Sequence, residues 1–338
     1  MKKLVTLFLS ALLIFSTLTM FACGQDPSSV TLVGLSDGTM VTPAAEYDYF
    51  VVPEPAATTK VNMTQGKLAI AGDLQALYGD GEGYPQAVLV AKKSVIENNG
   101  AVVSALVNSF NENKAWLQDE NTTAETIVNA VRSGFNSSDM TPTFTANNLS
   151  KTVINNCGIN FSLSTDAKSA VIDYLAKINA LSNNAFGAPV DEFFASVTET
   201  STNGATLSLY CPDGAPALSV ARLLNDSSLI PNLDIKVVMA NTIQTFVTGA
   251  TPTADICIMP VNAASKFLGS ASVYQMLGMV TNGNIYILKK EGGEDITKDN
   301  IRSVLNGKKI GVMNLANVPG LTLKAILNDA EIEFSEPA

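Results

Sequence analysis

The second half of the chain alternates short apolar runs with segments of helical spacing, and this alternation limits the folds open to it. Runs such as Ala254–Met259 and Lys309–Met313 are each followed by a turn and then by a helical pattern. Strands that are apolar along their whole length are typical of parallel sheets covered by helices on both faces. We therefore expect an α/β fold. The further strands expected here are Thr206–Tyr210, Asp234–Met239 and Gly283–Lys289, and the helices are Ala215–Leu224, Thr242–Thr248, Ala263–Leu268, Lys298–Leu305 and Leu321–Leu327.

The first half begins in the same style and then becomes mainly helical. The strands expected are Val30–Leu35, Asp48–Val52 and Gln86–Lys92, with a helix starting at Ala56–Lys60. Helical patterns then cover Ser94–Asn111, Asn121–Ser133, Leu149–Cys157 and Ala167–Leu181. The polar segment Thr198–Asn203 has no periodic apolar face, so it is predicted to be a linker.

The N-terminus has the pattern of an export signal. Lys2 and Lys3 precede the apolar run Leu4–Met20, which is short for a membrane span and ends at Ala22-Cys23-Gly24. This ending resembles the bacterial lipobox, in which the cysteine is acylated and becomes the mature N-terminus. The resemblance implies a signal peptide at 1–22, lipidation of Cys23 and a tether at 23–29, on the outer face of the cytoplasmic membrane or in the periplasm. The alternatives are a cleaved signal in which Cys23 has no special role, and an uncleaved anchor helix.

Composition excludes several classes of function. The chain has 31 acidic and 21 basic residues, and its net charge of −10 argues against nucleic acid or anionic lipid as a partner. It has no histidine, which removes the commonest general base and the commonest transition-metal ligand. Cys157, Cys211 and Cys257 are far apart, and we expect them to be buried rather than in a disulfide or a metal site. No catalytic residue, metal or cofactor is predicted.

Four turns between a strand and a helix are candidate ligand contacts: 210–216, 259–265, 314–320 and 52–56. Each lies at the carboxyl end of an apolar strand, where open α/β sheets bind ligands, and each exposes backbone N–H groups at a helix start. For any one turn, helix capping is the simpler interpretation. Tyr210 could equally belong to the core, Asp213 could cap its helix, and Glu54 could form a salt bridge at a hinge. The predicted ligand-binding residues are Tyr210, Asp213, Gly214, Ala215, Asn262, Ala263, Asn317, Gly320, Thr322, Ser36, Asp37 and Glu54.

Several of these segments resemble bacterial solute-binding proteins of the thiamine-precursor, taurine and nitrate type. From Thr206 to about Ala338 the chain is similar to the first half of that family, through 210–218, 254–268, 277–289 and 307–324. From Val30 to about Phe194 it is similar to the second half, above all at Asp48–Ala57. The resemblance implies a two-lobed periplasmic-binding-protein-like fold (type II), with a mostly parallel sheet flanked by helices in each lobe and a hinge between the lobes.

The two halves stand in the reverse of the family order, so we predict a circular permutant with 198–203 as the joint. Its lobes would be 86–290, which is continuous, and 30–85 plus 291–338, which is split. A rearranged reading frame, or fragments of two adjacent paralogues, are the alternatives.

The family resemblance implies a monomeric, lipid-anchored binding protein that delivers a small organic or anionic ligand to an ABC permease. A sensory or adhesive lipoprotein, or a rearranged product without function, are the alternatives. An enzyme is not expected.

Overall fold

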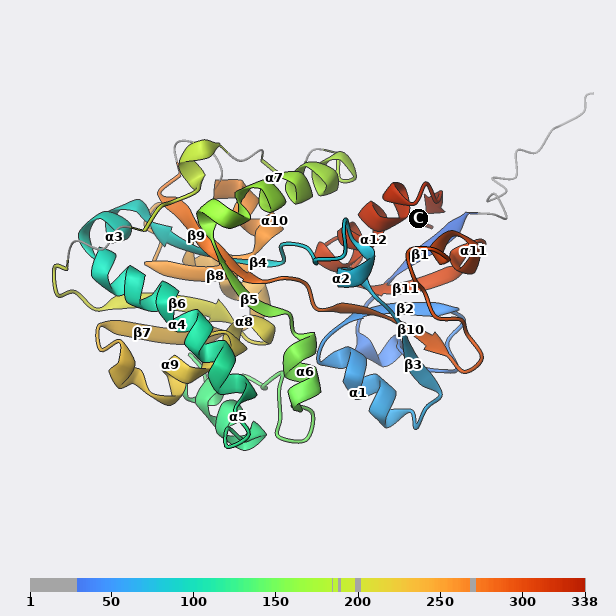
Figure 1. The fold of residues 1–338 in the computed structure, drawn as a ribbon, viewed down its shortest axis with the longest axis horizontal. Coiled ribbons are helices and arrows are strands. Elements are labelled where there is room, and N and C mark those ends of the chain that lie inside the picture. The colour runs from blue at the N-terminus through green and yellow to red at the C-terminus, as the bar shows by residue number, and fades with distance from the viewer. Residues whose placement is uncertain (1–28, 184, 188–189, 198–201, 268–271, 338) are drawn as a thin grey trace, which may run out of the picture.

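Two mixed sheets, each of six strands, form the framework of the molecule (Figure 1). The computed structural model describes residues 29–183, 185–187, 190–197, 202–267 and 272–337. We call the body around the first sheet lobe A and the body around the second sheet lobe B. Lobe A contains β1 (Val30–Leu35), β2 (Tyr49–Pro53), β3 (Leu68–Asp73), β10 (Ile285–Lys290), β11 (Lys309–Met313) and β12 (Phe334–Ser335), in the order β12-β1-β11-β2-β10-β3. Lobe B contains β4 (Ala87–Lys92), β5 (Ile159–Leu163), β6 (Leu207–Pro212), β7 (Leu233–Val238), β8 (Ile256–Pro260) and β9 (Tyr274–Thr281), in the order β5-β9-β4-β8-β6-β7.

Helices cover the faces of both sheets (Figure 1). Lobe A carries α1 (Ala56–Met63), α2 (Leu74–Leu77), α11 (Ile301–Leu305) and α12 (Val318–Asp329). Lobe B carries α3 (Lys93–Asn98), α4 (Gly100–Gln118), α5 (Ala124–Ser133), α6 (Lys151–Asn156), α7 (Ser164–Ala180), α8 (Ala215–Leu218), α9 (Ala221–Asn225) and α10 (Val261–Ala264). Short 3-10 turns complete the pattern at Gly38–Met40, Asp191–Phe193, Ser227–Leu229, Ala240–Phe246 and Ser265–Phe267. Among the described residues, no helix has both the length and the apolar content needed to cross a bilayer.

The α/β class expected from the sequence is confirmed, and both sheets are mixed: the lobe A sheet is mostly parallel, as expected, whereas in lobe B most of the strand pairings are antiparallel. In lobe B only β6 pairs in parallel, with β7 and β8, whereas β4 and β5 run antiparallel to their neighbours. In lobe A the antiparallel strand is β10, which lies between β2 and β3. Strands β4 and β10 run antiparallel to their neighbours because the chain enters each of them directly from the other lobe.

Several sequence-based boundaries need correction. The expected helix Ala215–Leu224 is broken into α8 and α9, with Ser219 donating its hydroxyl to the Pro216 carbonyl at 2.6 Å between them. The segment Thr242–Thr248 forms part of a 3-10 turn, and the helix expected over Ser94–Asn111 is interrupted at Asn99. Strand β10 was assigned to the continuous lobe, yet it pairs in lobe A, so the lobe boundary moves from residue 290 to the segment 282–284.

An apolar core fills each lobe, and one buried cluster passes between them. Leu89, Leu209 and Ile258 pack within lobe B against α4 and α5. A second cluster contains strand residues of both sheets, and three tyrosines in it contact one another between the two lobes. Tyr84 stacks on Tyr174 at 5.7 Å between ring centroids, and Tyr78 meets both rings edge-on. The lobes therefore share a continuous aromatic contact on this side.

The two ends of the described chain lie together at the edge of the lobe A sheet (Figure 1). Strand β12 pairs in parallel with β1, and the Val30 amide donates to the Glu333 carbonyl at 2.9 Å. Lys324 of α12, which is only 7% exposed, pairs with Glu336 at 2.7 Å and holds the tail in place. Cys23 and the predicted signal peptide, together with most of the predicted linker 198–203, lie outside the described residues.

Candidate ligand-binding site

The carboxyl ends of the parallel strands of both sheets face the boundary between the lobes. Strand β10 starts at this boundary, because only residues 282–284 separate it from β9 of lobe B. Since β2 runs antiparallel to β10, β2 ends at the boundary, as do its parallel neighbours β11 and β1. By the same reasoning β8, β6 and β7 end there, because β4 enters from lobe A and runs antiparallel to β8. The predicted turns are therefore brought to the two sides of one boundary (Figure 1).

Two crossover segments of the described chain connect the lobes, residues 78–86 and 282–284. Each contains glycine with positive φ where the two segments meet, Gly83 at 91° and Gly283 at 84°, and a side chain would be strained there. The Asn282 side-chain amide donates to the Glu82 carbonyl, so the two segments touch each other. A Cβ on Gly83 would also come within 2.7 Å of Asn282. The crossovers therefore run side by side at a place that only glycine can occupy.

A chain of hydrogen bonds crosses the boundary next to the crossovers. The Val261 amide of lobe B donates to the Gln86 carbonyl at 2.9 Å, and Gln86 Nε2 donates to Asn284 Oδ1 at 2.6 Å. The Asn284 carbonyl in turn accepts from the Glu54 amide at 2.9 Å. Gln86 Oε1 is buried and has no hydrogen-bond partner within the described part of the chain. The turn containing Asn262 and the turn containing Glu54 are thus linked through two amide side chains that the sequence did not single out.

Glu54 is 4% exposed and is fully engaged by neighbouring groups. Its carboxylate accepts from the Thr58 hydroxyl at 2.5 Å, the Thr58 amide at 3.1 Å and the Asn156 side-chain amide at 2.9 Å. The Thr58 bonds fasten the first turn of α1, whose N-cap Pro55 has no capping side chain. Glu54 therefore forms a hydrogen bond between the lobes, rather than the salt bridge that was the alternative from the sequence.

Asp213 fastens a loop over the end of β6. One carboxylate oxygen accepts from the Thr143 amide at 2.6 Å and the other from the Gly214 amide at 2.9 Å. Gly214 has φ of 109° and serves as the N-cap of α8, so glycine is required by the backbone at this turn. Ala215 begins the helix and is buried.

Tyr210 packs within the protein. Its ring lies 4.3 Å from that of Phe246 in a stacked arrangement, and Lys236 Nζ lies 5.7 Å from its centroid. With 9% of the residue exposed, the core role left open by the sequence is the one observed.

Asn262 and Ala263 are both buried at the start of α10. Asn262 is 9% exposed, and its side chain forms no hydrogen bond to any described residue. Asn262 is thus a buried polar side chain whose position no hydrogen bond within the described part of the chain explains.

The predicted residues of α12 have different environments. Asn317 is exposed at the N-cap, whereas Gly320 and Thr322 are buried. A Cβ on Gly320 would lie 1.9 Å from the Leu315 carbonyl oxygen, so this glycine is needed for close packing. Thr322 is fully buried and shares a 2.7 Å hydrogen bond with the hydroxyl of Tyr174 in lobe B. Burial raises the pKa of Tyr174 well above its usual range, so this tyrosine stays protonated.

Ser36 and Asp37 are exposed at the end of β1. Asp37 accepts from the Thr39 side chain and from the Thr39 amide at 2.7 Å, and these bonds lower the pKa of its carboxyl. Asp37 is therefore a capping residue of the following 3-10 turn.

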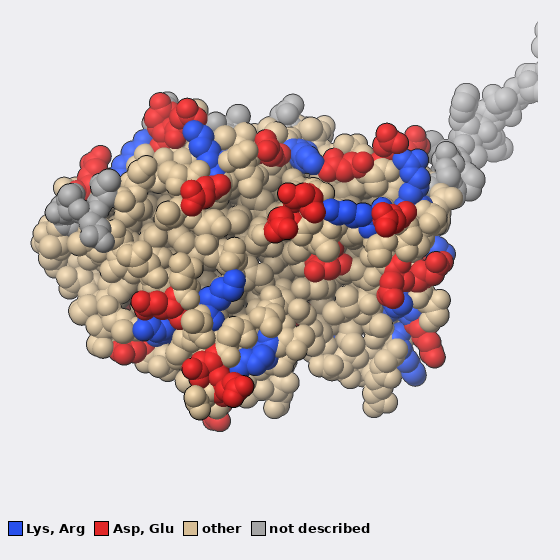
Figure 2. Space-filling model, in the orientation of Figure 1, with Lys and Arg blue, Asp and Glu red and all other residues tan. Residues whose placement is uncertain are grey.

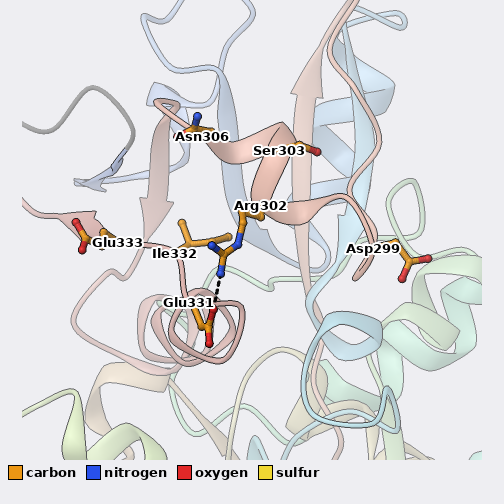
Figure 3. Close-up of a pocket in the computed structure, with 7 residues that line it drawn as sticks. All are labelled: Asp299, Arg302, Ser303, Asn306, Glu331, Ile332 and Glu333. Atoms are coloured by element: carbon orange, nitrogen blue, oxygen red, sulfur yellow. Dashed lines mark hydrogen bonds and ion pairs between the residues drawn. The ribbon is translucent and has the colours of Figure 1, made fainter.

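A cavity of about 660 Å³ lies elsewhere, on the outer edge of lobe A (Figure 3). Arg302 and Glu331 point towards each other in it and pair at 2.8 Å. Since α11 precedes β11, whose carboxyl end faces lobe B, this cavity is at the end of the sheet remote from the predicted turns. Its lining residues are Asp299, Arg302, Ser303, Asn306, Glu331, Ile332 and Glu333.

The described residues hold no cluster of three or more His, Cys, Asp or Glu side chains suited to a metal ion. Cys157, Cys211 and Cys257 are buried free thiols, as expected, and burial raises the pKa of each well above its usual value. Such thiols are poor nucleophiles and poor metal ligands.

Acidic and basic side chains are interspersed over the face shown in Figure 2, whose outline is notched between the lobes.

Comparison of the chain with known protein families, with characterised proteins and with solved structures finds no match.

Proposed function

We propose that this protein is a lipid-anchored solute-binding protein in which a small ligand binds between two lobes of a type II periplasmic-binding-protein-like fold. The observation that carries the proposal is the meeting of six parallel-strand ends, three from each lobe, at one boundary that two segments of the described chain cross. Ligands of open α/β sheets bind at such ends. Two bodies joined by short crossovers can close over a ligand by hinge bending.

The strand orders of the two lobes support this fold. Lobe B contains the run β7-β6-β8-β4-β9, and lobe A the run β1-β11-β2-β10-β3. The two runs correspond position by position: in each, the fourth strand is antiparallel and arrives from the other lobe. By this correspondence, β6, β7, β8 and β9, which are consecutive in lobe B, match β11, β1, β2 and β3 of lobe A. Following the same order in lobe A therefore means going from β11, near the C-terminus, to β1, near the N-terminus.

This passage through the chain ends also supports a circular permutation. Permutation is tolerated where the ends of the chain lie close together at the surface. Here β12 and β1 pair directly, so a parent chain could run from residue 337 to residue 29 without rearranging the sheet. The lipid on Cys23 would then hold lobe A to the membrane, and an ABC permease would receive the ligand.

A ligand panel tests the proposal. The exported protein is titrated with sulfonates, aminopyrimidines, nitrate and aromatic acids, with thermal unfolding and native mass spectrometry as readouts. A ligand present at 100 times its Kd stabilises the folded state by about 2.7 kcal/mol, which raises the unfolding temperature by several degrees. Asn262→Ala should weaken binding without lowering the unfolding temperature of the free protein, because the Asn262 side chain has no hydrogen-bond partner among the described residues to lose, and its carbonyl keeps the bond from Ser265. A chain that carries no ligand and gives no shift across the panel would contradict a transport role.

A further inference from the structure

The two lobes meet on two sides of the crossovers, and the two contacts differ in kind. On one side α7 of lobe B packs on α12 and the first crossover through Tyr174, Thr322 and the tyrosine cluster, all buried. Lys177 adds a 2.6 Å ion pair to Asp329 and lies 5.1 Å from the Tyr78 ring centroid. Separating this contact would expose large aromatic surfaces to water, so it is costly to open.

On the other side the contact is polar and centres on one residue, Asn156, at the end of α6. Its side-chain amide donates to Glu54 Oε1 at 2.9 Å, and its carbonyl accepts from the Tyr286 hydroxyl at 3.3 Å. Glu54 and Tyr286 both belong to lobe A, so lobe A holds both the side chain and the main chain of Asn156. Water can replace these two hydrogen bonds when the lobes part, so opening on this side costs less than separating buried aromatic packing.

From this asymmetry we infer that Glu54, Tyr286 and Asn156 form an interlobe clasp that sets the balance between closed and open forms, while the α7–α12 contact acts as the fixed side of the movement. The inference rests on the proposed function, because it takes lobe closure as the step that traps a ligand. Glu54 suits the task because its carboxylate keeps two bonds to Thr58 when Asn156 leaves. The open form therefore has no unpaired buried charge, and opening can be reversible.

The lobe separation of the ligand-free, full-length protein tests this clasp. Fluorophores are attached through unnatural amino acids at Met63 of α1 and Asn129 of α5, which are exposed and lie on opposite lobes. Asn156→Ala should raise the ratio of open to closed molecules about tenfold, since it removes a hydrogen bond to a charged group. Tyr286→Phe, which removes only a hydroxyl, should raise the ratio less. Asn155→Ala is the matched control: its side chain accepts from Gln118 within lobe B at 2.7 Å, so it should leave the ratio unchanged.

The outcomes separate the clasp from the transport proposal, because no ligand is needed for this measurement. An Asn156→Ala protein with the wild-type distance distribution would overturn the clasp, and so would an Asn155→Ala protein that opens equally. Opening by Asn156→Ala in a chain that binds no member of the ligand panel would support the clasp and count against transport.

Discussion

Gly320 was expected to contact ligand, and the structure gives it a packing role that one substitution can measure. In Gly320→Ala the new Cβ would lie 1.9 Å from the Leu315 carbonyl oxygen and 2.6 Å from Leu315 Cα. Both neighbours are backbone atoms, so relief requires a shift of the turn that leads into α12. Overpacking of this kind costs about 1 to 3 kcal/mol, whereas alanine in place of glycine inside a helix gains at most about 1 kcal/mol. We therefore expect a net loss of roughly 1 to 2 kcal/mol in the free energy of unfolding.

Gly34→Ala is the matched control for this experiment. Its Cβ would meet the same residue, Leu315, but at 3.5 Å from the side chain, an ordinary contact distance. We expect its free energy of unfolding to stay within about 0.5 kcal/mol of wild type, as for most substitutions without a clash. Urea unfolding followed by circular dichroism measures both variants. If Gly320→Ala is as stable as Gly34→Ala, the packing explanation is wrong.

Three further predictions concern charge, thiols and the anchor. Asp255 is partly buried, which by itself raises the pKa of its carboxyl, but hydrogen bonds from Ser208 and Lys92 outweigh burial and leave the pKa below its usual value. A depressed pKa contributes stability above the unfolded-state pKa of about 3.9, so Asp255→Asn should lose about 1 kcal/mol in the free energy of unfolding at pH 7. Urea titrations should show this difference from wild type shrinking as the pH falls below about 4. In a Cys23→Ser protein, the thiols of Cys157, Cys211 and Cys257 should not react with an aromatic disulfide reagent at pH 8 until the protein is unfolded, and rapid reaction of this native variant would contradict their burial. Cys23→Ser should abolish incorporation of labelled palmitate in cells and release the protein from the membrane fraction, whereas persistent labelling would place the lipid elsewhere.

The framework was readable from the sequence where strands are continuous apolar runs. Val30–Leu35 and Lys309–Met313 were predicted with the observed limits, because most of their residues are apolar and turn residues flank them. Strand β9 was missed, since Gly278 interrupts it and weakens the strand signal. In the fold that glycine accommodates the Phe161 ring of β5, to which a Cβ would come within 2.4 Å. Only the tertiary contact explains the residue.

The candidate site was predicted in part for a similar reason. Strand-to-helix turns are visible in a sequence, and the structure brings these turns to one boundary. Gln86, Asn284 and Asn156 carry no local signal, because each is one amide residue whose partners are far away in the chain. Conversely, Tyr210 and Gly320 looked like ligand contacts, and their packing against Phe246 and Leu315 could not be read from spacing alone.

A crystal structure of the protein purified with its endogenous ligand tests the central claim most directly. We expect a small molecule between the lobes, in contact with Asn262 and with the ends of β1, β2 and β11. Density for a bound molecule at another place, or a boundary closed by side chains alone in crystals soaked with every member of the panel, would contradict it.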